Sequence, residues 1–299
     1  MAEDPGIYVE ISIESTIDEI WRRTQTPDLH QQWDLRFTNI DYLPRHSDSE
    51  IQRFRYSTRI GLGLRIDGEG GSSGTSADAS GSRTSALSFW SSDPKSLISK
   101  GSGYWKYAPT ESSVRFWTWY DYSTRFGAAG RLIDRIAFRP LIGWATAWSF
   151  DRLRLWIEHG ILPETSFRMT LIHAFSRVFI AFIWAWQGFF PKLLFPSADE
   201  TIMLSAAGAP IYLLPTVGVV EVVFGLLCLI LWRWRGFFIL NCLVMLAALL
   251  EVALRSNSYL FAAFNPVTLN VGVIGLSLVG YLSGKDLPSA ARCLRRRSQ

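Results

Sequence analysis

The stretch PTVGVVEVVFGLL, Pro215–Leu227, holds one charged residue, Glu221, among apolar residues and glycines. It belongs to one of four apolar runs, each close to the roughly 20 residues that an α-helix needs to cross a bilayer. These runs cover residues 171–190, 210–232, 236–254 and 261–282. Buried helices of soluble proteins are usually shorter and show polar residues at helical spacing. The sequence therefore predicts an all-α bundle of four transmembrane helices.

Basic residues predict the orientation of these helices. Arg233 and Arg235 lie between the second and third runs, and the tail after the fourth run is also basic. An even number of spans places both segments, and everything before the first span, on one side, which the positive-inside rule makes the cytoplasm. The N-terminus lacks the basic and apolar regions of a signal peptide. We therefore expect a multi-pass protein of a bacterial inner (cytoplasmic) membrane, with both termini cytoplasmic.

Composition and cysteine usage argue against several kinds of site. Hydrophobic residues make up 48% of the 299 residues and charged residues only 19%, which is unusual for a soluble protein. The three cysteines are scattered, and no cluster of cysteine and histidine has metal-ligand spacing, so we expect no metal site. The basic run RCLRRR in the tail suits nucleic acid or anionic lipid. Because it follows a membrane helix, we favour lipid and expect no nucleic acid.

Residues 1–160 predict an α+β domain. IYVEISI alternates as a strand does, and two helical segments follow it, ESTIDEIWRRTQ and PDLHQQW. Strand-like segments come next, and then a long, largely apolar helix from about Ala128 to Glu158, interrupted at Pro140. The Gly- and Ser-rich stretch Gly68–Ser82 lacks the ending of a phosphate-binding loop, and we predict a flexible loop there.

The segment RFWTWYDYSTRF suggests an aromatic ligand site. Alternation places Trp117 and Trp119 on one face and Tyr120 and Tyr122 on the other. Because both faces are bulky, we expect the strand to be covered on both sides. Aromatic side chains around a cavity would bind an apolar or planar ligand; the alternative is a packed aromatic core. The candidate ligand-binding residues are His30, Trp33, Trp117, Trp119, Tyr120 and Tyr122.

Two further segments of this half each have two possible locations. His30, Trp33 and Asp34 are placed at the mouth of the cavity, although His30 also fits a surface or internally satisfied histidine. The apolar segment 140–150 is too short to cross a bilayer. It either lines the cavity or lies at the membrane surface with Arg152 and Arg154 at headgroups, and we favour the lining.

The order of elements in the first half resembles the SRPBCC or START-like superfamily. The resemblance is carried by VEISIESTIDEIWRRTQTPDLHQQWD and DRLRLWIE, and it implies a helix-grip fold, in which a curved sheet wraps around a long C-terminal helix and leaves a hydrophobic cavity. In the second half, RVFIAFIWAWQGFFPKLLFPSADE and VGVVEVVFGLL resemble the first two spans of the DoxX-like family. The matching positions are Arg177, Trp184, Gly188, Pro191, Lys192, Glu200 and Glu221.

These resemblances give the predicted organisation of the chain. We expect a cytoplasmic START-like domain over residues 1–160, a DoxX-like four-span domain over 165–285 and a basic cytoplasmic tail over 286–299.

Glu221 needs a partner or a proton, because an ionised group at bilayer depth costs at least about 2.5 kcal/mol. On its helix it shares a face with Gly218 and Gly225. Arg177 of the first span lies within reach, and we predict an Arg177–Glu221 pair; the alternative is that Arg177 extends to the headgroups. Glu251 and Arg255, one turn apart, are candidates for a second pair.

Three hypotheses for function follow. In the first, which we favour, the cytoplasmic domain binds a hydrophobic ligand, a lipid or a quinone-like molecule, and presents it to the bundle. In the second, the protein is a quinone-linked redox component in which Glu221 and Arg177 serve the quinone, the cofactor that the name of the DoxX-like family implies. In the third, the pair only fixes helix register.

No catalytic residue or cofactor is identifiable, since the bundle lacks a ligand set for haem, copper or an iron–sulfur cluster. We favour a binding or accessory role over an enzyme. Membrane lipid and a hydrophobic small molecule are the expected partners, and an oligomer is compatible with the sequence.

Overall fold

The computed structural model describes all residues except 1–5, 46, 48–49, 62, 264 and 298–299. Two compact units make up the chain. One runs from the N-terminus through Ser166 and takes in the C-terminal segment from Pro288; the other is Phe167–Leu287.

The first unit is built on one antiparallel sheet of seven strands in the order β1-β7-β6-β5-β4-β3-β2. Helices α1 (Ile17–Gln25) and α2 (Pro27–Trp33) separate β1 from β2. The hydroxyl of Thr16 accepts a hydrogen bond from the Glu19 backbone N–H (3.3 Å) and so caps the N-terminus of α1. The strands are β1 (Ile7–Ile13), β2 (Asn39–Tyr42), β3 (Arg53–Gly61), β4 (Leu64–Ala77), β5 (Arg83–Trp90), β6 (Ile98–Pro109) and β7 (Val114–Thr124).

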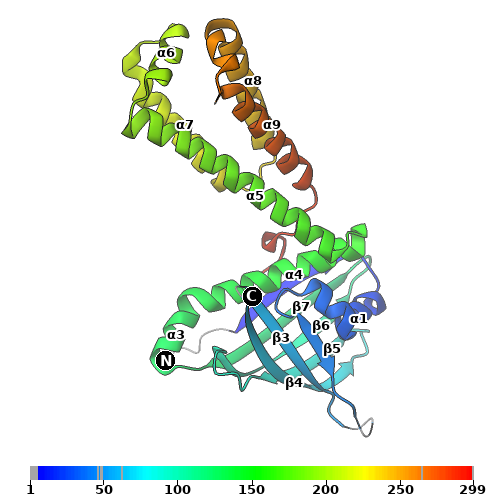
Figure 1. Ribbon diagram of the computed structural model, residues 1–299. Coiled ribbons are helices and arrows are strands. Elements are labelled where there is room, and N and C mark those ends of the chain that lie inside the picture. Colours follow the sequence, from blue (N-terminus) through cyan, green and yellow to red (C-terminus); the bar gives the residue numbers. More distant parts are fainter. Residues whose placement is uncertain (1–5, 46, 48–49, 62, 264, 298–299) are drawn as a thin grey trace. The chain divides into compact units, whose positions relative to one another are not determined.

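The long C-terminal helix of this unit is α4 (Arg139–His159), preceded by α3 (Gly127–Ile133) and a π-helical turn, η1 (Asp134–Phe138). Figure 1 shows α4 lying along one face of the curved sheet. Phe150 of α4 stacks on Phe116 of β7 with ring centroids 4.4 Å apart, and both rings are fully buried. The predicted helix-grip arrangement is therefore confirmed. The helix is irregular at η1, which ends two residues before Pro140, and not at Pro140 itself as predicted, because a proline is tolerated in the first turn of α4.

Strand β4 corrects a prediction, because most of the Gly- and Ser-rich stretch Gly68–Ser82 lies in this strand rather than in a loop. A Cβ added at Gly68 would lie 2.3 Å from the ring of Tyr56, and one at Gly70 would lie 2.3 Å from the ring of Phe54. The rings of the neighbouring strand thus lie over glycine backbone, which supplies the side-chain packing that β4 lacks.

The C-terminal segment is part of the first unit, not a separate basic tail over 286–299 as predicted. Leu294 exchanges two backbone hydrogen bonds of 2.9 Å with Glu10 of β1, the edge strand of the sheet. Cys293 is buried beside α4, and the Ser289 N–H donates to the carboxylate of Asp151 (2.7 Å). The segment thus covers an edge that would otherwise be open to pairing with another chain.

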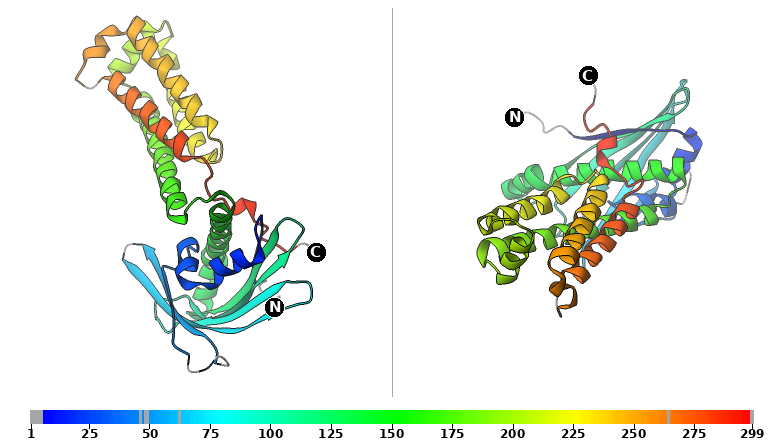
Figure 2. Two further views of the ribbon diagram at one scale, coloured as in Figure 1. Left: turned by 90° about the vertical axis from the view of Figure 1, so that its right-hand side faces the viewer. Right: turned by 90° about the horizontal axis from the view of Figure 1, so that it is seen from above.

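The second unit is helical. Its elements are α5 (Pro163–Gly188, beginning in the first unit), the π-helical η2 (Phe189–Leu194), α6 (Ala198–Ala206), η3 (Ile211–Leu213), α7 (Leu214–Ile230), α8 (Gly236–Arg255), η4 (Asn257–Phe261) and α9 (Pro266–Ser283). Figure 2 shows α8 and α9 side by side. In the described part of the chain, four helical stretches are long and apolar enough to cross a membrane: Pro163–Leu194, Ile211–Ile230, Gly236–Arg255 and Pro266–Ser283. The four predicted apolar helices of membrane-spanning length are confirmed.

Candidate functional site

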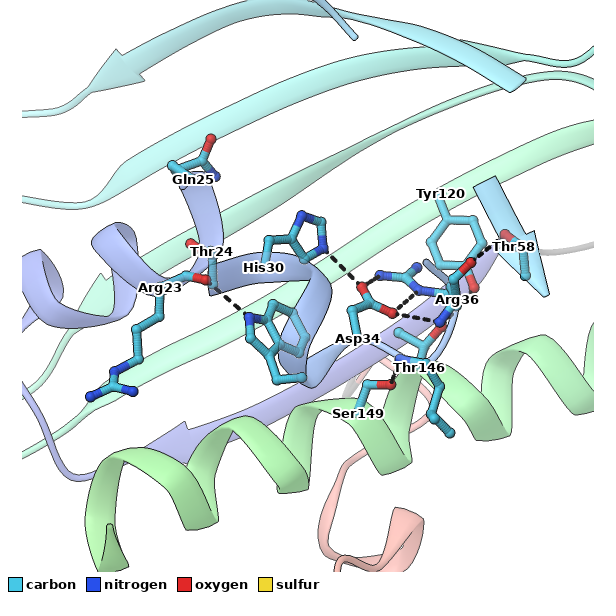
Figure 3. A network of polar contacts seen from close by, with 12 residues as sticks. Arg23, Thr24, Gln25, His30, Asp34, Arg36, Thr58, Tyr120, Thr146 and Ser149 are labelled. Atoms are coloured by element: carbon cyan, nitrogen blue, oxygen red, sulfur yellow. Dashed lines mark hydrogen bonds and ion pairs between the residues drawn. The ribbon is translucent and has the colours of Figure 1, made fainter. Parts of the chain in front are cut away.

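A network of buried polar side chains connects α2, β7 and α4 in the first unit (Figure 3). His30 lies on α2, and Asp34 and Arg36 follow directly after that helix. The carboxylate of Asp34 accepts hydrogen bonds from Arg36 Nε (2.9 Å) and Arg36 Nη2 (2.6 Å), and His30 Nε2 lies 3.0 Å from the same carboxylate. Only 1% of Asp34 is exposed. The network is a buried ion pair with a histidine as its third member.

Two hydroxyl groups of α4 complete this network. Ser149 Oγ accepts a hydrogen bond from the Leu35 backbone N–H (2.9 Å), and Thr146 Oγ1 lies 2.8 Å from the hydroxyl of Tyr120. The guanidinium of Arg36 lies 5.4 Å from the ring centroid of Tyr120. These contacts hold the loop after α2 against α4 and β7.

Burial and the Arg36 charge set the protonation states of this network. Burial lowers the pKa of His30 more than the Asp34 carboxylate raises it, so the imidazole is held neutral. Burial alone would raise the pKa of Asp34, but the Arg36 guanidinium outweighs it and holds that pKa well below its usual range. Burial raises the pKa of the Tyr120 hydroxyl. At neutral pH the network is therefore an Asp34–Arg36 ion pair flanked by a neutral histidine and a neutral tyrosine.

A row of aromatic rings, the aromatic strip, continues from this network across β3 and β2. It consists of Phe37, Tyr56, Phe54 and Tyr42, with neighbouring ring centroids 5.4, 6.4 and 6.2 Å apart. His30 joins the strip to the network, because its ring lies 5.3 Å from that of Phe37. The first three rings are only half-buried, and Tyr42 is 46% exposed.

The predicted cavity residues of β7 lie on opposite faces of the sheet. Tyr120 and Tyr122 are buried on the inner face, as is Phe116. Trp119 is 38% exposed on the outer face and stacks on Tyr104. Trp117 shares the outer face, so neither tryptophan lines the interior, and the expectation that β7 is covered on both sides was wrong. The alternation identified the two faces correctly, but bulky residues on both of them hid which one was covered.

The residues predicted at the cavity mouth lie deeper than expected. Trp33 is fully buried in the core, and its indole N–H donates to the Arg23 carbonyl (3.0 Å). His30 is the internally satisfied histidine of the two alternatives. Segment 140–150 divides: Phe150 is packed inside the unit, whereas Leu141 is exposed.

Two recesses of the first unit lie away from these residues. The larger of the two holds about 500 Å³ and is lined by residues 14–17 and 109–114, around the turn of the β6–β7 hairpin. Between α4 and β7 the interior is filled, since Tyr107, Phe116 and Phe150 stack in succession at 5.0 and 4.4 Å. This part of the fold is the packed aromatic core that the sequence left as an alternative.

A charged cluster in the second unit corrects the predicted Arg177–Glu221 pair. In the described part of the chain, Glu221 forms an ion pair with Lys192 (2.9 Å), and Lys192 also contacts Glu200 (3.1 Å). Only 6% of Lys192 is exposed. The π-helical turn η2, which contains Lys192, packs directly against α7, which carries Glu221. The cation that meets Glu221 therefore comes from the far end of the first span.

Close backbone packing brings these helices together. A Cβ added at Gly188 would lie 2.5 Å from the Gly218 carbonyl oxygen and 2.9 Å from the Cβ of Glu221. Pro191 of η2 contributes a carbonyl that accepts from the Ser197 N–H (2.8 Å). Five of the family-matching positions, Gly188, Pro191, Lys192, Glu200 and Glu221, therefore converge where α5, α6 and α7 meet.

Arg177 is fully buried and is satisfied elsewhere. Its guanidinium donates to the Cys228 carbonyl (2.5 Å), the Trp234 carbonyl (3.0 Å) and His173 Nε2 (3.0 Å). It also lies 4.7 Å from the ring centroid of Phe238. Backbone carbonyls at the end of α7 and in the following turn hold this charge inside the bundle, so it neither pairs with Glu221 nor extends to headgroups.

Two further polar contacts join the remaining helices. The Trp184 indole N–H donates to Asn241 Oδ1 (2.7 Å), and Asn241 Nδ2 donates to Ser277 Oγ (2.6 Å), which links α5, α8 and α9. The expected pair of Glu251 and Arg255 is absent from the described residues, because Arg255 donates to the Ala207 carbonyl (3.0 Å). Such interhelical hydrogen bonds stabilise bundles in lipid, where apolar burial does not.

Comparisons with known proteins agree with this membrane domain. The DoxX-like family matches residues 181–278, which include the charged cluster. YndG of Bacillus subtilis (strain 168), described as an uncharacterized membrane protein, is 49% identical over 184 residues, 61% of this chain and 68% of YndG. The chain belongs to the same family as YndG. This YndG relative is a membrane protein in which a DoxX-like domain follows a unit with the helix-grip fold.

Solved structures similar to the chain cover about its first half. A STAR-related lipid transfer protein from Xanthomonas axonopodis is 14% identical, with a TM-score of 0.39, over 50% of this chain and 83% of that one. A START superfamily protein from Mycobacterium smegmatis is 13% identical, with a TM-score of 0.37, over 52% of this chain and 99% of that one.

Proposed function

We propose that the START-like unit binds an apolar ligand with one polar group, such as a lipid or a quinone-like molecule, and presents it to the DoxX-like bundle. The observation that carries the proposal is the half-buried aromatic strip that ends at the buried network of His30, Asp34 and Arg36. Small-molecule sites are mostly apolar and contain a few fixed polar groups that orient the ligand.

The aromatic strip and the buried network are suited to binding the two different ends of one ligand. The rings of Phe54 and Tyr56 lie over glycines of β4 and are half-buried, and aromatic rings pack well against a planar or hydrocarbon group. Arg36 is held by the Asp34 carboxylate through Nε and Nη2, and its fixed guanidinium beside Tyr120 suits a carbonyl, hydroxyl or phosphate oxygen.

The experiment uses the full chain in lipid nanodiscs. Bound small molecules are extracted and identified by mass spectrometry from the wild type, from Tyr56→Ala and from Trp119→Ala. Trp119 is the matched control, because it is a similarly exposed aromatic residue on the opposite face of the sheet. We expect the wild type and Trp119→Ala to retain the same molecule, and Tyr56→Ala to bind it about tenfold more weakly.

Two outcomes would contradict the proposal. One is a wild-type protein that retains no molecule beyond bulk nanodisc lipid. The other is equal retention by Tyr56→Ala and wild type.

A second candidate, quinone-linked redox function, is favoured by the position of Lys192 between Glu200 and Glu221 inside the bundle. Ionisable residues at bilayer depth often serve proton transfer or a substrate. The test is Glu221→Gln in protein that folds normally. Quinone binding that is unchanged in this variant would count against a redox role.

A further inference from the structure

The segment of residues 126–144, which leads into α4, exposes an unusual amount of apolar surface. It comprises α3, the π-helical turn η1 and the first residues of α4, and Figure 1 shows α3 at the free end of α4. Its exposed large apolar side chains are Phe126 (58%), Leu132 (59%), Ile133 (55%), Ile136 (69%), Leu141 (61%) and Trp144 (44%). Soluble surfaces rarely gather so many large apolar groups, and such a patch marks an interaction site.

The exposed charged side chains of the segment are all basic. Its acidic residue, Asp134, is buried, accepts a hydrogen bond from Tyr122 (2.7 Å) and pairs with Arg139 (3.0 Å). Arg131 and Arg135 are exposed, and neither has a hydrogen-bond or ion-pair partner among the described residues. The surface of the segment therefore combines apolar side chains with two uncompensated positive charges.

The backbone presents these side chains outward. Ile133 and Ile136 are three residues apart, as are Leu141 and Trp144, while five residues separate Ile136 from Leu141. Ile136 lies within the π-helical turn Asp134–Phe138, whose wider turn takes up one extra residue, so the spacing of five corresponds to about one turn. Phe126 begins the segment in the left-handed region (φ 64°), which is uncommon for a bulky residue.

We propose that residues 126–144 dock on the surface of the bilayer that holds the protein's own helices, with the apolar side chains at the level of the acyl chains and Arg131 and Arg135 at anionic headgroups. This occupant is favoured over another protein by two observations. The chain carries four candidate spans, the first of which begins at Pro163, four residues after α4 ends at His159. The segment also has the composition of an interfacial amphipathic helix, with bulky apolar groups beside arginine and no exposed acid. The proposal does not depend on the ligand.

A fluorescent probe on an exposed position tests the contact. Ile136→Cys in the full chain is labelled with an environment-sensitive dye and reconstituted in nanodiscs of phosphatidylcholine with or without phosphatidylglycerol. The native cysteines are buried, so wild type treated with the same dye should stay unlabelled and checks the specificity of the label. Leu64→Cys, at an apolar position of β4 that is also exposed (53%, against 69% for Ile136), is the matched control.

At position 136 we expect the emission of the probe to be shifted to the blue and the probe to be protected from an aqueous quencher, with both effects larger when phosphatidylglycerol is present. The probe at position 64 should remain exposed to solvent. Adding Arg131→Gln and Arg135→Gln should weaken the docking equilibrium in phosphatidylglycerol by about thirtyfold. A probe at 136 that stays exposed to aqueous quencher in both lipids would overturn the proposal. So would protection that disappears in nanodiscs holding a single copy, because the face would then be covered by a second copy.

Discussion

The charged cluster of the membrane domain predicts that two substitutions at one ion pair have very different costs. Lys192→Met removes the only cation from a site where two carboxylates, Glu200 and Glu221, lie within 3.1 Å of it among the described residues. Glu221→Gln instead leaves Lys192 paired with Glu200. The two variants remove opposite partners of the same contact, so any difference between them reports what is left behind.

The magnitude follows from the charge that each change leaves in the bundle. Removing one partner of a buried ion pair costs about 3–5 kcal/mol, because the other charge remains uncompensated. Lys192→Met should therefore lower the free energy of unfolding of the bundle by about that amount. Glu221→Gln should cost about 1 kcal/mol, the scale of one hydrogen bond. The double variant should recover part of the loss, since only Glu200, whose side chain is 20% exposed, then remains charged.

The assay must report on the bundle alone. Cys228 and Cys242 are buried in α7 and α8, so their labelling by a thiol reagent at increasing concentrations of sodium dodecyl sulfate, read by mass spectrometry, follows unfolding of this unit. The reasoning is refuted if Glu221→Gln costs as much as Lys192→Met, or if the double variant is no better than Lys192→Met. It is also refuted if exchanging the charges of Arg177 and Glu221 preserves stability.

Three other predictions concern separate parts of the molecule. Gly188→Ala should destabilise the bundle by about 2 kcal/mol in the same labelling assay, because its Cβ would meet the Gly218 carbonyl, whereas Gly275→Ala, with open space around it, should be neutral. The stability of the first unit should fall as the pH drops below about 6.5, because the lowered pKa of His30 means that the unfolded chain binds the proton more readily than the folded one. The thermal midpoint, measured between pH 6.5 and 5, should therefore depend less on pH in His30→Gln than in the wild type. Deleting residues 288–299 should lower the free energy of unfolding of the first unit in urea by at least about 2 kcal/mol, because the deletion unpairs Glu10 of the edge strand and removes the Ser289 and Arg292 donors from one oxygen of the buried Asp151 carboxylate; an unchanged midpoint would contradict the packing described here.

The periodicity of the sequence predicted the helices and strands well, but it predicted the contacts between distant side chains poorly. Period-two alternation separated Tyr120 from Trp119 correctly, and hydropathy located four spans, because both patterns depend on neighbours along the chain. The partner of Glu221 depends on how α5 and α7 are rotated about their axes. The π-helical turn that contains Lys192 alters that rotation locally and has no clear signal in composition.

Gly68 and Gly70 illustrate a second limit. A run of glycine and serine has the composition of a flexible loop, and no residue within it indicates a strand. The side chains that complete the packing, Phe54 and Tyr56, come from the neighbouring strand. Cross-strand partners of this kind become visible only once the register of β3 and β4 is known.

The pairing of Leu294 with Glu10 has a consequence for the order of synthesis. Residues before the first span leave the ribosome early, but the segment that pairs with the edge strand of their sheet emerges only after the fourth span. The first unit therefore reaches its final fold after the membrane helices have been made. Because that unit contains chain from both sides of the bundle, its C-terminal segment can reach β1 only when an even number of spans has crossed the bilayer. Correct membrane insertion is thus a precondition for covering the edge of the sheet.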